Sequence, residues 1–467
     1  MNLTLNLISF IGIFGLCLVA WLGSENRRII PWKTIFAGIG LQLAIGLLLF
    51  QVPGTRQFIV LLNDILNPLI DASEAGARFI FGSGFVPDPA SDPGPGPAAR
   101  WIARTITSPY APVPGDRLGP DNLNLGYIFA FRALPQVVFF SAIVALLYRM
   151  NAIQPIVRVF AKLFRQVMNL SGAESLSGAV NIFVGIESAI AVKPFLLDMT
   201  RSELCAILTC CFGSIASTIL GLYASLLRPT FPGIVGHLMS ASILTIPACF
   251  AIAKIIVPET EVPKTLDGVP KEEEDPKIRK PSYMDSLIMG SWDGVKMAVG
   301  IAAVLIAILG LVALLNSFFA FLATWPAIGP VFAVVTLDNI FGALFFPLTF
   351  LTGVSLDLSE LWQCSVLIGR RVLQTEIPSF IALNQLSARD ALSDRALLIV
   401  SYVLCGFAHV GSLGIFVGGL TSLVPQRRKD ISSVAWKALW AATLATLMTG
   451  CIAGVFYFGD SAAILGR

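Results

Sequence analysis

Two glutamates stand in segments of the chain that are apolar but interrupted by charge. Glu187 lies within residues 172–199, and Glu376 lies within residues 359–384. A carboxylate at membrane depth is costly unless it binds a partner. Such a group can accept hydrogen bonds from the hydroxyl or NH groups of a solute, and it can carry a coupling proton. The alternative is a structural ion pair, for example between Glu376 and Arg371.

Oxygen-bearing residues form a second candidate site close to the first glutamate. Asn181 and Ser214 supply side-chain oxygens, and Val184 and Ile215 can offer backbone carbonyls where a helix is broken. Hard cations such as sodium prefer oxygen ligands of this kind. From the residue types alone, packing and hydrogen bonding are the commoner roles of Asn and Ser in membrane helices.

The sequence contains no motif for metal-binding, catalytic or nucleic-acid-binding chemistry. The eight cysteines contain no CxxC pair, and two histidines are too few for a histidine-based metal centre. No nucleophile elbow, phosphate-binding loop or basic nucleic-acid patch is present. We therefore expect no enzymatic activity, no catalytic residue, no cofactor and no nucleic-acid partner.

The composition requires a lipid environment. Of the 467 residues, 55% are hydrophobic and 13% are charged, and the mean hydropathy is +0.79. A bilayer span needs roughly 20 mostly apolar residues, so we expect an all-α polytopic membrane protein with about eight transmembrane helices. The expected spans are residues 5–23, 34–51, 127–147, 203–226, 234–256, 296–316, 399–424 and 434–458.

Charged loops orient these spans. Basic clusters follow the first, third, fifth and seventh spans, so all four lie on one side, which the positive-inside rule makes cytoplasmic. We expect a multi-pass protein of the cell inner membrane, in contact with lipid, with both termini outside. Residues 1–26 contain no Lys or Arg, so we interpret the first stretch as a span and not as a signal peptide.

Four regions follow from this pattern. Residues 83–124 are an external insertion rich in Pro and Gly, preceded by an amphipathic segment at 57–82 that we place along the membrane surface. The predicted regions are an N-terminal part (1–126), a first repeat (127–256), a cytoplasmic linker (257–295) and a second repeat (296–467).

The two segments that contain the glutamates are too broken to span the membrane cleanly. Re-entrant hairpins that line a cavity would satisfy their polar groups, and extramembrane loops are the alternative. Each segment precedes a similar phrase, in which Phe212 aligns with Phe407 at an offset of 195, while the glutamates lie 189 apart. The expected topology gives the two copies opposite orientations. Inverted repeats that meet at mid-membrane are typical of secondary transporters.

Seven sequence motifs stand in order from about residue 127 onward. They are LPQVVFFSA at 134–142, SGAESLS at 171–177, NIFVG at 181–185, MTRSEL at 199–204, CGFA at 405–408, GGL at 418–420 and RRKD at 427–430. These motifs resemble those of the concentrative nucleoside transporter family. The resemblance implies a homotrimer in which each protomer moves a transport domain like an elevator and takes up nucleosides with sodium or protons. The first hairpin would contact the base, and the second hairpin and seventh span would contact the ribose.

Carried over residue by residue, the resemblance implies two groups of site residues. The sodium ligands would be Asn181, Val184, Ser214 and Ile215. The substrate-binding residues would be Gly185, Ile186, Glu187, Thr375, Glu376, Phe407, His409 and Ser412.

The chain departs from the family pattern on both sides of the expected ligand. Ile186 stands where the family has Gln, and Thr375 and His409 each stand where it has Asn. A purine nucleoside, a modified nucleoside or another polar solute is therefore an alternative to a standard pyrimidine nucleoside. Proton coupling is an alternative to sodium, because Glu187, Glu376 and His409 can titrate. A gate or receptor with the same hairpins but without active transport is the third class.

Overall fold

The computed structural model describes residues 3–86, 128–266 and 281–459, apart from positions 184, 186, 187, 189–191, 194, 327 and 333. Within these residues the chain is helical and contains no strand, as expected. Most of the predicted external insertion and residues 267–280 of the predicted linker lie outside the described residues.

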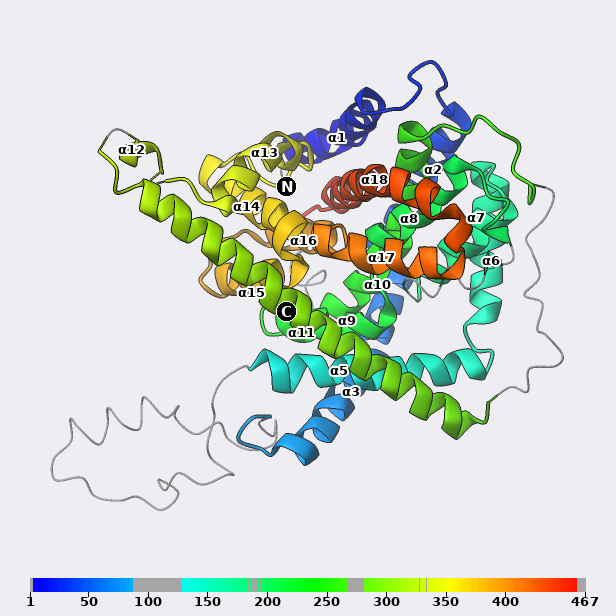
Figure 1. The fold of residues 1–467 in the computed structure, drawn as a ribbon, viewed down its shortest axis with the longest axis horizontal. Helices are drawn as coiled ribbons and strands as arrows, with labels where there is room; N and C mark the ends of the chain where they lie inside the picture. Colours follow the sequence, from blue (N-terminus) through cyan, green and yellow to red (C-terminus); the bar gives the residue numbers. More distant parts are fainter. Residues whose placement is uncertain are drawn as a thin grey trace.

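Six helices of the described chain are long and apolar enough to cross a membrane, and they confirm six of the predicted spans (Figure 1). Helix α11 is much longer than predicted, because it begins at Tyr283 inside the expected linker. The six helices are α1 (Leu3–Leu22), α2 (Trp32–Gln51), α5 (Phe129–Arg149), α10 (Ile234–Ile256), α11 (Tyr283–Leu322) and α18 (Arg428–Val455).

The two remaining predicted spans are discontinuous helices. The span at 203–226 consists of α8 (Arg201–Gly213) and α9 (Ser217–Leu227), and the span at 399–424 consists of α16 (Asp394–Leu404) and α17 (Val410–Leu423). At the first break Ser214 has an extended backbone, and at the second His409 does. Each break contains or follows a glycine, the residue with the lowest helix propensity after proline. Freed backbone groups are tolerated at membrane depth only where protein or a cavity satisfies them.

The second predicted hairpin is formed by two helices that meet at a single residue. Helix α14 (Leu358–Gln374) is followed by Thr375, and α15 (Glu376–Ala388) begins directly after this residue. Thr375 has a φ of 72°, a left-handed conformation that a β-branched residue rarely adopts. In the first predicted hairpin, α7 (Gly172–Asn181) is held by a capping box between Ser171 and Glu174.

Several helices were not predicted as spans. Helix α13 (Leu337–Leu351) was missed because its 15 residues are shorter than a bilayer span. Helix α3 (Pro53–Phe81) covers the segment that we predicted to be amphipathic. The shorter elements are α6 (Gln154–Met168), α12 (Gly329–Phe332) and the 3-10 turn η2 (Pro425–Arg427).

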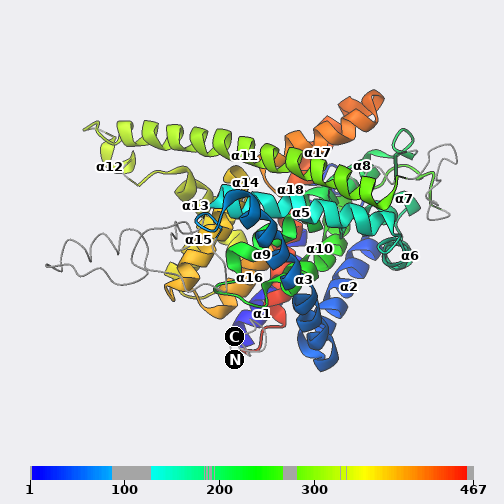
Figure 2. The same cartoon turned by 90° about the horizontal axis from the view of Figure 1, so that it is seen from below.

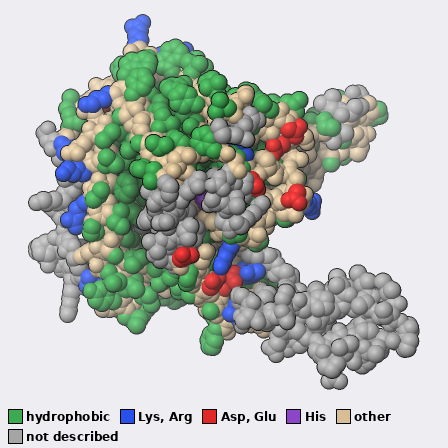
Figure 3. Space-filling model, turned by 180° about the vertical axis from the view of Figure 1, so that it is seen from behind, with side chains coloured by type: hydrophobic (Ala, Val, Ile, Leu, Met, Phe, Trp, Pro, Cys, Tyr) green, Lys and Arg blue, Asp and Glu red, His purple; other side chains and the backbone are tan. Residues whose placement is uncertain are grey.

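The core lies among α8, α10, α16 and α18, whose side chains are almost entirely buried. Helix α11 lies across α5 in both ribbon views, with Gly290 and Gly294 against the backbone of α5 (Figures 1 and 2). Helix α11 otherwise exposes large apolar side chains, including Val299, Ile306 and Phe318. Hydrophobic side chains also cover much of the face in Figure 3, as expected of a surface that contacts lipid.

The two helix breaks touch each other. A Cβ atom added to Gly406 would lie 2.5 Å from the carbonyl oxygen of Gly213, and one added to Gly213 would lie 2.3 Å from Cys249 Sγ. Real Cβ atoms essentially never approach other atoms this closely, so a side chain at Gly406 would press on backbone atoms of Gly213, and one at Gly213 would require the Cys249 side chain to shift. The contact joins the α8 break to the α16 break in the centre of the molecule.

We predict that Gly406→Ala destabilises the protein, because backbone atoms of Gly213 cannot move aside as a flexible side chain could. Overpacking of this kind costs about 1–3 kcal/mol. The measurement is thermal unfolding of the detergent-solubilised protein. Gly414→Ala is the matched control, since Gly414 lies on α17 and a Cβ atom added there would meet no atom of another element within 4 Å. An equal melting temperature for both variants would contradict the proposed importance of the contact.

Candidate functional site

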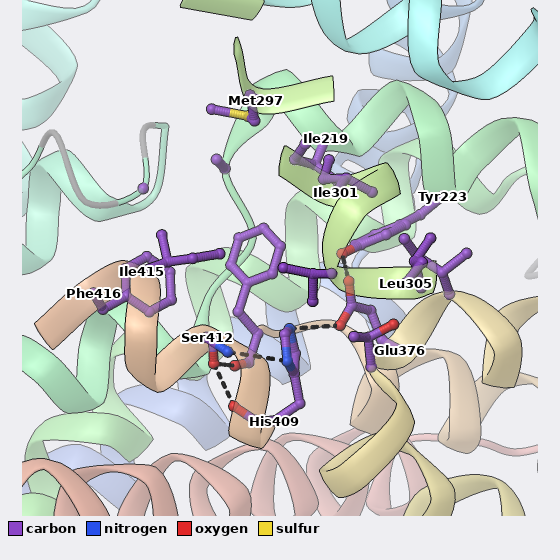
Figure 4. Close-up of a pocket in the computed structure, with 16 residues that line it drawn as sticks. Ile219, Tyr223, Met297, Ile301, Leu305, Glu376, His409, Ser412, Ile415 and Phe416 are labelled. Carbon is purple, nitrogen blue, oxygen red and sulfur yellow. Dashed lines mark hydrogen bonds and ion pairs between the residues drawn. The ribbon is translucent and has the colours of Figure 1, made fainter. Parts of the chain in front are cut away.

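A cavity of about 110 Å³ lies between the second hairpin, the two helix breaks and α11 (Figure 4). Its wall is mostly apolar, and the ionisable groups on it gather at one side. The lining residues are Gly185, Ala216, Ile219, Tyr223, Met297, Ile301, Val304, Leu305, Thr375, Glu376, Ile377, Phe407, His409, Ser412, Ile415 and Phe416.

Glu376 is the acidic group of this cavity, and only 2% of the residue is exposed. It is the first residue of α15, where the positive end of the helix dipole favours a carboxylate. Its Oε1 accepts a hydrogen bond from the hydroxyl of Tyr223 on α9. Its Oε2 lies 3.2 Å from Nε2 of His409. The carboxylate thus joins three elements that are far apart in sequence.

His409 is the N-cap of α17. Its Nδ1 accepts a hydrogen bond from the backbone N–H of Ser412 at 3.2 Å, so in the neutral ring the proton is on Nε2. That nitrogen faces the Glu376 carboxylate (Figure 4). The hydroxyl of Ser412 lies 2.6 Å from the backbone oxygen of His409 and reinforces the same turn.

Two adjacent residues, Thr375 and Glu376, each have an oxygen atom that can still form a hydrogen bond with a ligand in the cavity. Thr375 Oγ1 is buried and has no hydrogen-bond partner. Glu376 Oε2 is also buried without a hydrogen-bond partner, although Nε2 of His409 lies 3.2 Å from it. Buried polar atoms without a partner are costly, so a ligand that satisfies both atoms would be stabilised.

Arg371 is not the ion-pair partner of Glu376 that the sequence offered as an alternative. It is fully buried on α14, where its guanidinium donates to the carbonyl of Val403 and, at 3.0 Å, to Thr446 Oγ1. Val403 lies in the last turn of α16, so Arg371 binds a carbonyl freed by the helix break.

The oxygen-bearing residues near the first break are also brought together. Asn181, the last residue of α7, donates from Nδ2 to Cys211 Sγ at 3.4 Å, and its Oδ1 is buried with no hydrogen-bond partner. Ser214 Oγ lies 3.2 Å from the backbone oxygen of Asn181 and 2.9 Å from that of Cys210. Ile215 is buried beside them, whereas Val184 lies outside the described residues. This set of oxygens fits a small hard cation.

Six of the eight predicted substrate-binding residues line this cavity. They are Gly185, Thr375, Glu376, Phe407, His409 and Ser412. The other two, Ile186 and Glu187, lie outside the described residues, so their predicted contact with the base stays a prediction.

Sequence reasoning missed two side chains. Tyr223 was counted as part of an apolar span, although a buried tyrosine hydroxyl usually needs a partner and could have been matched to a buried carboxylate. Cys211 was not singled out, and it is buried with its sulfur accepting a hydrogen bond from the Asn181 amide. No signal in the sequence places that contact.

Comparisons with known proteins cover most of the chain. Three family models match, described as the Na+ dependent nucleoside transporter N-terminus (residues 11–84), nucleoside recognition (130–230) and the Na+ dependent nucleoside transporter C-terminus (237–454). A Haemophilus influenzae protein described as an uncharacterized transporter is 30% identical over 98% of this chain and 99% of its own length. Solute carrier family 28 member 3 of Mus musculus is 32% identical over 96% of this chain, which spans only 59% of that longer protein.

Solved structures lead to the same family. CNTnw in an inward-facing substrate-bound state matches with a TM-score of 0.80 at 30% identity, over 97% of this chain and 98% of that chain. A variant of the same protein in an outward-facing state matches with a TM-score of 0.80 at 29% identity, over 97% and 98% of the two chains. The described chain is accordingly a multi-pass membrane protein, and it belongs to the concentrative nucleoside transporter family.

Proposed function

We propose that this protein is an ion-coupled symporter that imports nucleosides across the cell inner membrane. The observation that carries the proposal is the buried carboxylate of Glu376, held by Tyr223 and His409 in a cavity between two broken helices. Secondary transporters bind their solutes at such interfaces between discontinuous helices.

The cavity offers complementary surfaces for a nucleoside. Glu376 can accept hydrogen bonds from sugar hydroxyls, and the Thr375 hydroxyl can accept or donate one, because each side chain has a buried oxygen without a hydrogen-bond partner. Apolar and aromatic side chains can pack against a planar base, and Phe407 and Phe416 have ring centroids 5.9 Å apart on the cavity wall. We place the sugar at Glu376, Phe407, His409 and Ser412, and the base toward Gly185, Ile186 and Glu187.

Sodium is the coupling ion that we propose. Its ligands would be Oδ1 of Asn181 and Oγ of Ser214, together with backbone oxygens of Val184 and Ile215. The Oδ1 atom of Asn181 supports this assignment, because it is buried without a hydrogen-bond donor and a bound cation would satisfy it. Proton coupling through Glu376 and His409 is the second candidate, favoured by the direct contact of the two side chains.

We propose an elevator-type movement. On the cavity wall, α11 contributes Met297, Ile301, Val304 and Leu305, and the last three have hydrocarbon side chains that carry no hydrogen-bonding group. The second hairpin can therefore slide past these three side chains of α11 without breaking hydrogen bonds to them. The inward-facing and outward-facing states of CNTnw support a movement of this kind. Exposed apolar side chains on α11 suit contacts with lipid and between the protomers of a homotrimer.

The experiment that tests the whole proposal is radiolabelled uptake into proteoliposomes, with a nucleoside panel under a sodium gradient, a proton gradient and no gradient. Accumulation above the external concentration is expected only with a gradient. Equilibration without accumulation would indicate a passive gate, and binding without uptake would indicate a receptor.

The first prediction of this proposal concerns Glu376→Gln. Hydrogen bonds to a charged group contribute about 1.5–3 kcal/mol, which corresponds to roughly 10- to 100-fold weaker binding of a ribonucleoside when the charge is lost. Isothermal titration of the purified protein measures it. Glu261→Gln, which changes an exposed carboxylate outside the cavity, should bind like the parent. Glu187→Gln should weaken binding less, and unchanged affinity in Glu376→Gln would remove this residue from the site.

The second prediction concerns the ion. Asn181→Ala or Ser214→Ala removes one oxygen ligand and should raise the half-saturating sodium concentration severalfold. Ser240→Ala is the matched control, since the Ser240 hydroxyl donates to Gly236 within α10. Uptake at fixed pH should also collapse when choline replaces sodium. Sodium-independent uptake that an uncoupler abolishes would overturn sodium coupling and establish the proton alternative.

A further inference from the structure

The sulfur atom of Cys211 contacts two residues of the first hairpin. Cys211 lies on α8, and only 1% of the residue is exposed. Its Sγ accepts a hydrogen bond from Nδ2 of Asn181 at 3.4 Å, and it lies 3.8 Å from Oγ of Ser188. Asn181 and Ser188 are both fully buried, and they stand before and after residues 182–187 in the chain. The thiol therefore joins α8 to the hairpin at two points.

These contacts assign different roles to the two ends of the Asn181 amide. An amide carries its donors on nitrogen and its acceptor on oxygen, and a thiol has one weak donor and a weak acceptor. When the S–H group donates to the Ser188 hydroxyl, the sulfur is left as an acceptor, which suits Nδ2 of Asn181 and not Oδ1. Because Nδ2 faces Cys211, Oδ1 lies on the other side of the amide, where it is buried without a hydrogen-bond partner.

The orientation of this amide decides whether it can bind a cation. With Nδ2 at Cys211, the group offers an unpartnered oxygen. With the amide turned round, the two N–H donors would take the place of that oxygen, and their positive ends would repel a cation. The backbone at this position is held separately, because the Ser214 hydroxyl donates to the carbonyl oxygen of Asn181 at 3.2 Å. The side-chain orientation therefore depends on the contact with Cys211.

We infer that Cys211 is a positioning residue of the sodium site: it orients the Asn181 amide so that Oδ1 is presented to the ion. The inference rests on the proposed sodium coupling and adds to that site a residue that does not bind the ion itself. Sodium prefers oxygen ligands, and a thiol sulfur suits softer metals. Cys211 thus acts on the ion only through Asn181.

Cys211→Ala should weaken sodium binding, because the amide N–H loses its acceptor and the orientation of the group is no longer fixed. Loss of one neutral hydrogen bond corresponds to an increase of about three- to tenfold in the half-saturating sodium concentration. Cys211→Ser keeps an acceptor at this position and should stay within about twofold of the parent protein. Cys205→Ala is the matched control, since Cys205 is a fully buried cysteine of the same helix that contacts Thr209 and not the hairpin.

The measurement is thermal unfolding of the purified protein as sodium replaces choline at constant ionic strength, without nucleoside. A bound ion raises the melting temperature by mass action, so the midpoint reports sodium binding independently of transport. Sodium-dependent uptake into proteoliposomes gives a second value for each variant.

A second background separates positioning from packing. Asn181→Asp replaces the amide by a carboxylate, which carries oxygen at both ends and has no N–H to orient. In this background, Cys211→Ala should change the half-saturating sodium concentration by less than about twofold. A residue that acts only through packing would have the same effect in both backgrounds.

The outcomes separate the inference from the function on which it rests. An unchanged sodium midpoint in folded Cys211→Ala would overturn the inference and leave sodium coupling intact, and so would an increase of equal size in Asn181→Asp or one that Cys211→Ser shares. If Cys211→Ala does not fold, Cys211→Val fills the space without an acceptor and makes the same test. A parent protein that sodium neither stabilises nor drives would refute sodium coupling, and the inference would fail with it.

Discussion

The structure depends on satisfying the backbone polar groups that are freed where two helices break inside an apolar molecule. In lipid or in a dry core, an unsatisfied N–H or C=O costs several kcal/mol, so each break needs partners. Arg371 supplies one by donating to the carbonyl of Val403 at the end of α16. His409 supplies another by accepting the Ser412 N–H at the start of α17. The site is built from the same groups that make the breaks possible.

The same residues satisfy the helix breaks and line the cavity, and for this reason the ionisable side chains of the cavity contact one another. Glu376 begins a helix, binds Tyr223 and faces His409, so it completes the fold of the second hairpin as well as offering an acceptor to a solute. At the first break, Ser214 lies close to the carbonyls of Cys210 and Asn181 while its oxygen remains part of a possible cation site. The structural roles and the proposed functional roles therefore fall on the same residues.

The sequence was sufficient where the signal was local. Long apolar stretches predicted six helices, and charge in an apolar segment identified Glu376 in its cavity. The sequence was insufficient where a side chain contacts residues that lie far away in the chain. Tyr223 looked apolar, Arg371 lay close to Glu376 in sequence yet turns to Val403, and the 15-residue α13 fell below the length of a span. Breaks rich in small residues look like ordinary packed helices until both halves are seen together.

The contact between Gly213 and Gly406 carries a consequence for how such proteins can diverge. Residues in contact have non-additive effects on stability, so the tolerance of one position is set by the other. A side chain at Gly406 would require the two breaks to move apart, because its Cβ atom would meet the carbonyl oxygen of Gly213, and such a shift would carry Ser214 and His409 with it. Across descendants of this chain, Gly406 should therefore be retained while residues of the cavity wall vary, so that substrate preference can change around a fixed contact between the two breaks.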